Sequence, residues 1–458
     1  MSDFSANATL RAIREATRWL FLLTLIYAPW AYGCTTAVTV VILNYLLGAV
    51  MFLWVADLLL RRTKPTISPG LIILVGVLLV IGWGMSWNAK GVYDTAFEIF
   101  APAPQLVAWL PGSLDAPNSI AWMIRATLLL LSVCFVADLV QRPAWLLRLW
   151  YAIGIGGGSI ALFGLIEKAS GARMIFWEDW PAKDSPTFFA TYFYHANAGA
   201  FLNLVFPLTV GMAARMFQTT RSVLVKTVWL TAGIAVTVAI IANTSRAAQA
   251  IGVVSMLIVA VLLLPQVRSV VGRAEKGTIA AGILVGALAI YAVAQASRLD
   301  QPIKRWSTLS SQIGIDARWD AQHAAIVAIP EASWFGFGPG TFRSIFPHYV
   351  EASHGKLEGT WRFLHEDYLQ TILEWGWVGS LFWALLFFGG LLVAFRALRR
   401  GGNNWLPRQR SITPLVLIAL VSIALHSLVD FPLQIASIQL YAAVYLGICW
   451  AAATWSRG

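Results

Sequence analysis

Residues Trp377 to Ala397 read WVGSLFWALLFFGGLLVAFRA, an almost unbroken apolar run. A helix of this length rises about 30 Å, which is the thickness of the hydrocarbon core of a bilayer. The residues that lead into the run, Arg362 to Gly379, read RFLHEDYLQTILEWGWVG and include a histidine, three carboxylates and a tyrosine. A polar cluster at the mouth of a membrane helix is where a membrane enzyme would hold its reacting groups.

The composition indicates that the whole chain is a membrane protein. Of its 458 residues, 58% are hydrophobic and 12% are charged, and the mean hydropathy is +0.69. Soluble domains have about 25% charged residues. The apolar segments are continuous runs, which excludes the ten-residue alternation of a β-barrel. We therefore predict an all-α polytopic membrane protein with a single integral membrane domain, 1–458.

About twelve membrane spans are predicted. The first ten lie near 19–32, 38–60, 71–87, 120–140, 149–166, 194–215, 227–242, 246–268, 278–294 and 377–397, and the last two flank a short turn at 426–432. The longest connection, Gln295 to Glu374, is a loop between spans nine and ten. A loop of this length without structure is unusual, so we expect it to contain short helices. No short signal-peptide pattern precedes the first span, which is expected to stay in the mature protein.

The basic residues indicate an orientation in the membrane. The net charge is +11, but the lysines and arginines lie in short clusters between apolar spans, which argues against a nucleic-acid partner. Most of the 33 fall on the side of the N-terminus, so both termini are predicted to be cytoplasmic. The long loop and all six histidines then lie on or beside the opposite face.

No metal site or disulfide framework is expected. The three cysteines, Cys34, Cys134 and Cys449, are scattered along the chain. The histidines lack the H-x-x-x-H or H-E-x-x-H spacing of zinc sites.

His365 is the first candidate for chemistry. Helical periodicity places Tyr368 and Leu369 on its face, near the membrane edge. Histidine ordinarily titrates near neutral pH, which suits proton transfer. Glu366 or Asp367 could orient the ring or serve as the base. The alternative is a solvated helix cap with an incidental histidine.

Two arginines are candidates for binding an anion. Arg246 lies between two apolar spans with almost no loop, where an arginine is costly unless it reaches the interface or an anionic partner. Its guanidinium suits a phosphate or carboxylate, and the alternative is a snorkelling interfacial side chain. Arg318, followed by Trp319, lies in the long loop, and an arginine in such a place is by itself more typical of a surface ion pair than of a ligand contact.

Several further features have open interpretations. His195 and Asn197 lie at the mouth of a span, and His426 and Asp430 lie at another, where they could pair with each other or with the long loop. The segment 177–180 (WEDW) suits either glycan stacking or an interface anchor. The alternating glycines of 336–340 (GFGPG) suit a turn that docks the loop better than a nucleotide-binding loop, because no strand precedes them.

In this order, these residues resemble the O-antigen ligase and polymerase superfamily of bacterial envelope glycan enzymes. The resemblance is carried by His195-Ala-Asn197 with Phe206-Pro207, Thr244-Ser-Arg246, Arg318-Trp319, Pro330, the segment 336–347, His365-Glu-Asp-Tyr-Leu-Gln370 and Glu374-Trp-Gly376-Trp-Val-Gly379. The chain departs from the family after the histidine, where Glu366 stands in place of a frequent asparagine.

The resemblance implies a C-type glycosyltransferase fold with a large periplasmic loop, in the bacterial inner membrane. It also implies an undecaprenyl-pyrophosphate-linked glycan donor and no metal or other cofactor. His365 would be the base, alone or with Glu366 or Asp367, and Arg246 and Arg318 would hold the pyrophosphate. His195, Asn197, Trp319 and Tyr368 would be near the glycan or the acceptor. The acceptor could be lipid A core, a lipid-linked repeat or a protein side chain.

Two other classes of function remain open at the level of sequence. A flippase or transporter of envelope glycans would suit twelve spans, but the two halves of the chain show no similarity, and the polar residues gather at one face instead of the midplane. A scaffold in an envelope-synthesis complex would make the histidine cluster incidental.

Overall fold

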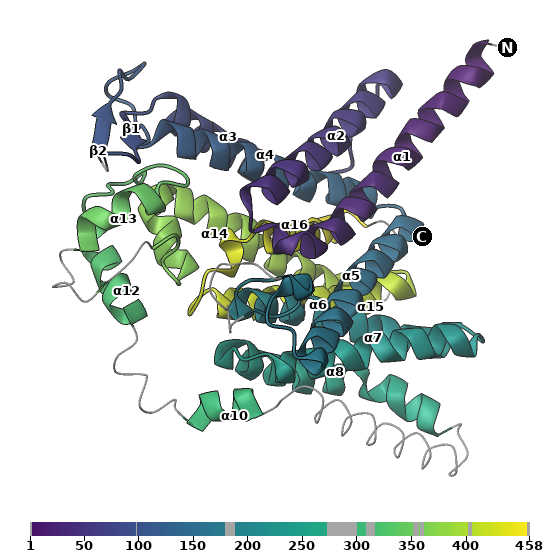
Figure 1. The fold of residues 1–458 in the computed structure, drawn as a ribbon. Coiled ribbons are helices and arrows are strands. Elements are labelled where there is room, and N and C mark those ends of the chain that lie inside the picture. The colour runs from purple at the N-terminus through teal and green to yellow at the C-terminus, as the bar shows by residue number, and fades with distance from the viewer. Residues whose placement is uncertain are drawn as a thin grey trace.

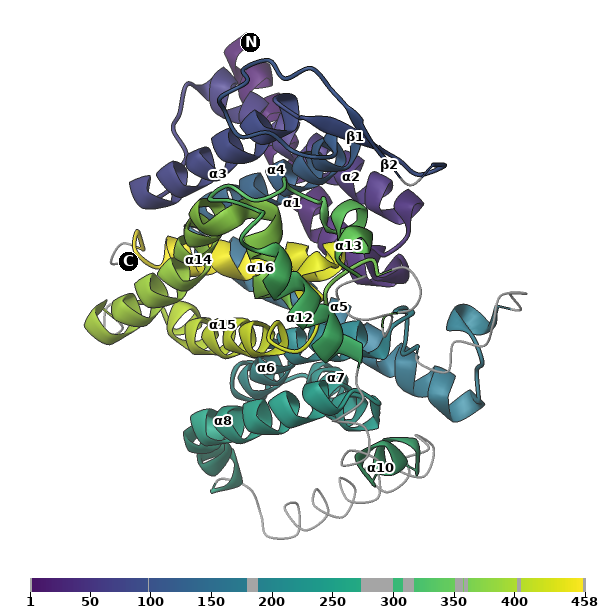
Figure 2. The ribbon, with the colours of Figure 1, turned by 90° about the vertical axis from the view of Figure 1, so that its left-hand side faces the viewer.

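The computed structural model describes residues 2–97, 99–178, 188–272, 300–307, 317–350, 357, 361–401 and 405–455. They form a helical bundle with one small hairpin (Figures 1 and 2). In chain order the elements are α1 (Ser2–Trp30), η1 (Tyr32–Cys34), α2 (Ala37–Arg61), α3 (Pro69–Trp87), β1 (Gly91–Asp94), β2 (Ile99–Pro102), α4 (Ala116–Leu139), α5 (Pro143–Ser170), η2 (Ile175–Trp177), α6 (His195–Thr219), α7 (Val223–Ala242), α8 (Arg246–Val271), α10 (Asp300–Ser307), α12 (Ala317–Ala328), α13 (Phe342–Val350), α14 (Asp367–Gly401), α15 (Pro407–His426), η6 (Pro432–Gln434) and α16 (Ala436–Ala451).

The helices confirm the prediction of an all-α polytopic membrane protein. Within the described ranges, nine helices are long and apolar enough to cross a membrane: α2 to α8, α14 and α15. Helices α1 and α16 correspond to the first and last predicted spans, although α16 has only 16 residues. The ninth predicted span, near 278–294, lies outside the described residues.

The two ends of the bundle carry different parts of the chain. The N and C ends lie at one end, whereas the β1–β2 hairpin, α12 and α13 lie at the other (Figure 1). This arrangement agrees with the predicted topology, in which the termini share one face and the long loop lies at the opposite face. The loop contains the short helices α10, α12 and α13, as expected.

Helices α6 and α16 form the centre of the bundle. Of the apolar window in α6, 78% is buried, and nearly every residue of α16 is buried. Glycines in α5 let its neighbours approach closely, because a Cβ at Gly154 would lie 2.4 Å from Trp229 and one at Gly157 would lie 2.6 Å from Val205. Small residues at helix contacts are typical of membrane bundles, where dispersion contacts hold helices together.

Helix α14 begins at Asp367, ten residues before the predicted span, and breaks at Gly376, where φ is +62°. The break leaves backbone carbonyls available for partners from the long loop. The Leu373 carbonyl accepts from the Phe337 amide at 2.8 Å, and the Glu374 carbonyl accepts from the Gly338 amide at 2.9 Å. The glycine-rich segment is therefore the docking turn that the sequence indicated.

The loop between α3 and α4 contains a hairpin that was not predicted from the sequence. Strands β1 and β2 pair antiparallel, with Gly91 opposite Pro102. The Leu114 amide donates to the Phe337 carbonyl at 2.8 Å, and the Ser119 hydroxyl donates to the Pro339 carbonyl at 2.6 Å. This loop thus holds the docking turn from the side opposite α14.

Candidate functional site

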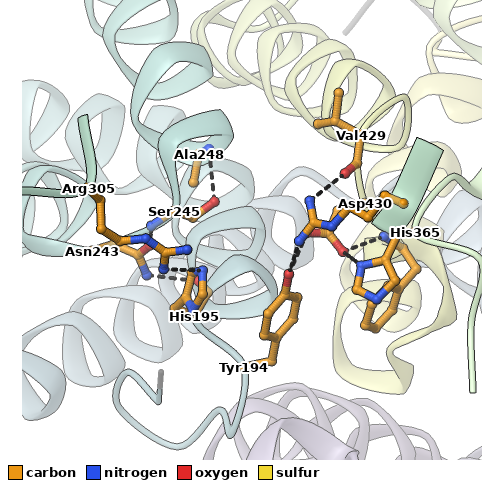
Figure 3. Close-up of polar contacts among 11 residues, drawn as sticks. Tyr194, His195, Asn243, Ser245, Ala248, Arg305, His365, Val429 and Asp430 are labelled. Atoms are coloured by element: carbon orange, nitrogen blue, oxygen red, sulfur yellow. Dashed lines mark hydrogen bonds and ion pairs between the residues drawn. The ribbon is translucent and has the colours of Figure 1, made fainter. Parts of the chain in front are cut away.

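Several helix ends converge near His365 at the end of the bundle that carries the long loop. Helices α6, α8, α12 and α14 bring residues at or next to their N-termini there, together with the turn after α15 (Figure 3). The N-terminus of a helix carries a partial positive charge and unpaired amide groups. The backbone therefore favours an anionic ligand at this place before any side chain is considered.

His365 is held by a buried carboxylate. Its Nδ1 lies 3.0 Å from Oδ1 of Asp430 in the turn after α15 (Figure 3). The Asp430 side chain is only 4% exposed, whereas the His365 side chain is 22% exposed. The edge of the His365 ring packs on Phe431, with ring centroids 4.5 Å apart. The ring is thus anchored on one edge and remains partly accessible.

The other oxygen of Asp430 connects to Tyr194 and Arg318. The Tyr194 hydroxyl donates to Oδ2 of Asp430 at 3.1 Å, and Arg318 donates to the Tyr194 hydroxyl at 2.6 Å. The Arg318 guanidinium also donates to the Val429 carbonyl at 3.3 Å and lies 3.8 Å from Asp430. The imidazole, the carboxylate, the phenol and the guanidinium therefore form one continuous network.

The network keeps Asp430 ionised. Burial by itself would raise the pKa of Asp430, but the hydrogen bond from His365 and the charge of Arg318 outweigh it, so this pKa lies below its usual value. Burial, followed by the charge of Asp430, raises the pKa of Tyr194. The phenol is consequently a neutral donor at physiological pH.

A second set of contacts surrounds His195 at the start of α6. Its Nε2 lies 3.1 Å from Nη1 of Arg305, a residue of α10 (Figure 3). The Asn243 amide donates to the His195 carbonyl at 2.9 Å and accepts from the Ser245 backbone at 2.7 Å. Asn243 therefore ties the start of α6 to the start of α8.

The charges of three arginines, Arg246, Arg305 and Arg318, influence one another in the region between these two sets of contacts. Burial lowers the pKa of Arg305, and the charges of Arg246 and Arg318 lower it further. The rings of Tyr194 and His195 are 4.8 Å apart and join the two sets of contacts. Closely spaced positive charges repel one another unless an anion lies between them, so the region is suited to a multivalent anion such as a pyrophosphate.

Four of the residues predicted from sequence, Arg246, Arg318, His195 and His365, lie in this region. Asn197 is buried in the first turn of α6, where its amide donates to the Tyr194 carbonyl at 3.1 Å. Trp319 lies on α12 with 61% of its surface exposed.

Glu366 and Asp367 shape the site through contacts with other groups. Glu366 accepts from the Tyr368 and Leu369 amides at 3.3 and 2.5 Å and so caps α14; burial raises its pKa. Asp367 accepts from the Ser427 hydroxyl at 2.9 Å and from the Leu433 amide at 2.9 Å. Asp367 thereby braces the turn that carries Asp430, which is the carboxylate at the His365 ring.

The remaining features that the sequence singled out are Tyr368, His426 and the segment 177–180. The Tyr368 hydroxyl donates to the Ala424 carbonyl at 2.8 Å and joins α14 to α15. His426 is fully buried, and within the described residues neither of its ring nitrogens has a hydrogen-bond partner. Of the segment 177–180, Trp177 is half-exposed and donates to Ser170 at 2.8 Å, whereas Asp179 and Trp180 lie outside the described residues.

Sequence reasoning missed Arg305 and Tyr194. Arg305 follows Lys304 in a loop with no motif, so nothing local distinguishes it from a surface charge. Tyr194 immediately precedes the predicted His195, and its position at a span mouth was the available signal. Of the two partners considered for Asp430, the structure shows the long loop, through His365 and Arg318.

Comparison with known families finds a match over part of the chain. Residues 230–384 match the family model described as O-antigen ligase. The matched stretch is about a third of the chain and includes Arg246, Arg305, Arg318 and His365, whereas Tyr194 and Asp430 lie outside it. A search of curated proteins finds no match. The family match confirms the resemblance to the O-antigen ligase and polymerase superfamily and indicates a glycan-transferring function in a multi-pass membrane protein.

Proposed function

We propose that this chain, which resembles the O-antigen ligases and polymerases, transfers an undecaprenyl-pyrophosphate-linked glycan onto an acceptor hydroxyl. The reaction would take place at the periplasmic face of the bacterial inner membrane. The family match supports glycan transfer in general. The observation that carries the proposed chemistry is the His365–Asp430 pair beside three arginines.

His365 serves as the general base. When the Nδ1–H group donates a hydrogen bond to the Asp430 carboxylate, Nε2 carries the free lone pair. The ionised Asp430 then stabilises the imidazolium that forms as the acceptor hydroxyl loses its proton. Tyr194 and Arg318 hold the second oxygen of Asp430 and so fix the direction of the ring.

Arg246, Arg305 and Arg318 bind the pyrophosphate. A planar guanidinium matches phosphate oxygens with two parallel hydrogen bonds. The N-termini of α8 and α12 lie beside Arg246 and Arg318 and add the field of two helix dipoles. These groups stabilise the negative charge that grows on the leaving group.

The reaction is a displacement at the anomeric carbon of the donor. The acceptor oxygen forms the new bond to this carbon as the bond from carbon to pyrophosphate breaks, and the electron pair of the broken bond stays on the phosphate oxygen. The hydroxyl proton moves to Nε2 of His365. The products are the extended acceptor and undecaprenyl pyrophosphate. Trp319, which is 61% exposed, offers a stacking face for the glycan or the acceptor, and the half-buried Tyr368 would contact the same substrates.

The test is transfer by the purified protein in lipid, with the lipid-linked glycan as donor. His365→Ala should reduce transfer about 100-fold or more, the usual contribution of a general base. His323→Ala is the control, because His323 is an exposed histidine of α12 in the same loop. Unchanged transfer by His365→Ala at normal expression would exclude His365 as the base.

The choice of acceptor in the same assay identifies the type of enzyme. Longer chains and free undecaprenyl pyrophosphate from the donor alone would identify a polymerase. Activity only after lipid A core or a protein is added would identify a ligase or a protein glycosyltransferase. The absence of transfer with every acceptor would favour a flippase.

A further inference from the structure

A group of arginines surrounds the start of α5, at the end of the bundle opposite the long loop. Gln141, just before α5, donates to the Thr454 hydroxyl near the C-terminus at 2.8 Å, so this place belongs to the end that carries the termini (Figure 1). The proposed reaction uses none of these arginines. They are Arg18 in α1, Arg142 and Arg148 at the start of α5, and Arg408 at the start of α15.

Two of these guanidinium groups contact the same indole. The Cζ atom of Arg18 lies 5.2 Å from the ring centroid of Trp145, and that of Arg148 lies 4.4 Å from the same centroid. Arg148 also lies 5.5 Å from the ring of Trp19, which packs edge-on against Trp145 at 5.6 Å. Aromatic faces attract cations and orient guanidinium planes. The two indoles therefore hold two positive charges close together where α1 packs on α5.

The charge of Arg18 is poorly compensated. The residue is only 8% exposed, and its ion-pair partner among the described residues is Glu15, at 3.1 Å, whose side chain is 49% exposed and hydrated. Burial, followed by the charge of Arg142, lowers the pKa of Arg18 to about 10. Arg18 is still charged at neutral pH, and a bound anion would stabilise it.

Asp138 is a nearby carboxylate that contributes little to this compensation. Its Oδ1 accepts from the Thr66 amide at 2.8 Å, and its Oδ2 accepts from the Trp54 indole at 3.3 Å. Among the charges that act on Arg18, that of Asp138 has the smallest effect. Both of its oxygens are engaged elsewhere, so the arginine group keeps an excess of positive charge.

Many donors in the group are available to a ligand. A guanidinium has five N–H groups. Within the described residues, no hydrogen bond or ion pair involves the side chain of Arg142 or Arg148, and Arg142 is the N-cap of α5 without capping it through its side chain. The Arg408 guanidinium donates to the Pro143 carbonyl at 3.0 Å and brings a further cation to this turn. The dipole of the long helix α5 adds to the positive field.

The group lies at the depth of the bilayer headgroups. Arg18 immediately precedes the first predicted span, and the next residue, Trp19, is exposed, as is typical of tryptophan at a membrane interface. Leu23, one turn further along α1, is also exposed and continues the apolar surface into the membrane. A phosphate bound by the arginines would leave its acyl chains beside Leu23.

We propose that the arginines around the start of α5 form a binding site for the phosphodiester headgroup of an anionic phospholipid. The phosphate oxygens accept from Arg18 and Arg148, which the indoles hold in place, and from Arg142 at the N-terminus of α5. A guanidinium matches phosphate with two parallel hydrogen bonds, and basic pockets between membrane helices suit anionic headgroups. The site contains no reacting group, so the inference is independent of the proposed function.

The test is lipid binding by the purified full chain in detergent, measured by native mass spectrometry. The protein is titrated separately with phosphatidylglycerol and with phosphatidylcholine of the same acyl chains. The first phosphatidylglycerol should bind with a Kd at least about tenfold lower, because the choline group carries a positive charge toward the arginines. Equal Kd values for the two lipids would overturn the inference.

Arg18→Gln combined with Arg148→Gln should raise the Kd for phosphatidylglycerol about tenfold or more and leave that for phosphatidylcholine unchanged. The control combines Arg399→Gln with Arg400→Gln, which removes the same charge from exposed positions in the last turn of α14, where Arg399 lies 5.7 Å from the ring of Phe395. Equal losses in the two double variants would mean that net charge alone attracts the lipid, and the site would be refuted. If the double variant fails to fold, Arg148→Gln alone makes the same comparison at a half-buried position.

Glycerol 3-phosphate distinguishes a lipid from a soluble phosphate compound. It carries the phosphate of the headgroup without acyl chains, so an excess of it should leave the bound phosphatidylglycerol in place. Displacement of the lipid by glycerol 3-phosphate would assign the site to a soluble phosphate compound and overturn the lipid assignment.

Discussion

His365 has a backbone conformation that few histidines adopt, with φ at +61°. A left-handed conformation costs a residue with a Cβ about 1–2 kcal/mol, so the surrounding contacts must compensate for it. The contact with Asp430 and the packing on Phe431 do so. The strain lies at the one residue whose ring must point toward the convergent helix ends, which is typical of functional sites.

Asp430→Asn should lower transfer about 100-fold, because the amide keeps the shape of the side chain but cannot stabilise an imidazolium. Donor binding should change little if Asp430 acts through His365. The measurement is kcat and the donor Kd of the variant beside those of the wild type. A large loss of donor binding with unchanged kcat would contradict the assignment.

The same variant tests the pH dependence of stability. The pKa of Asp430 lies below its usual value in the folded protein, so the unfolded chain takes up the proton first as the pH falls. Asp430 therefore stabilises the fold above the unfolded pKa of about 3.9, and this contribution disappears as the pH falls through the folded pKa. The melting temperature of Asp430→Asn should therefore fall less than that of the wild type between neutral and strongly acidic pH. Parallel curves would refute this.

Arg305→Gln should reduce kcat/KM for the lipid-linked donor about 10- to 100-fold, because a charge-assisted hydrogen bond to phosphate is lost. Lys304→Gln removes the same charge from the preceding, exposed position and is the control. If both variants lose activity equally, the effect is one of net charge and not of a specific contact.

At the scale of elements, the broken helix α14 decides where the long loop sits. The Gly376 break frees carbonyls for the docking turn. The Glu374 carboxylate adds two contacts, accepting from the Gly340 amide at 3.1 Å and the Phe342 amide at 3.2 Å. A single turn of α14 therefore positions the segment that leads into α13.

Gly376→Ala should undock the loop. With φ at +62° and ψ at −171°, the backbone conformation is essentially restricted to glycine, and a Cβ would lie 2.2 Å from the Trp334 carbonyl oxygen. The cost of such a conformation is about 1–3 kcal/mol. We expect faster proteolysis within residues 317–350 and about tenfold lower transfer.

Gly84→Ala is the matched control for this change. Gly84 lies inside α3, and a Cβ there would meet nothing within 4 Å. Alanine at such a position stabilises a helix by about 0.5–1 kcal/mol. Similar proteolysis patterns for the two variants would show that the break in α14 does not hold the loop.

At the scale of the whole molecule, the two ends of the bundle have different roles. The β1–β2 hairpin, α12 and α13 lie at one end, and the chain termini lie at the other (Figure 1). The basic clusters between spans predict that the termini face the cytoplasm. The proposed reaction requires the opposite end to face the periplasm.

A pair of cysteine variants tests this orientation. Lys90→Cys lies in the loop before β1 and Lys64→Cys lies between α2 and α3, and both lysines are exposed. The native cysteines Cys34, Cys134 and Cys449 are buried and give little background. A membrane-impermeant maleimide added to cells with a permeabilised outer membrane should label Lys90→Cys and not Lys64→Cys. The reverse pattern would place the site in the cytoplasm.

The sequence by itself determined the class of fold and most spans, because hydropathy and helical length are local properties that the bilayer imposes on each segment separately. It also predicted His365, Arg246 and Arg318 as site residues, since a charged or titratable residue at the mouth of an apolar span differs clearly from its neighbours.

Only the tertiary structure decided which of these groups touch. Glu366 and Asp367 adjoin His365 in the chain but turn to the backbone of α14 and to the turn after α15, whereas Asp430, sixty-five residues away, reaches the ring. Arg305 joins the anion-binding region through a contact with His195 that spans 110 residues. Such contacts depend on how helices pack and where their ends meet, and neither leaves a periodic signal within a single segment.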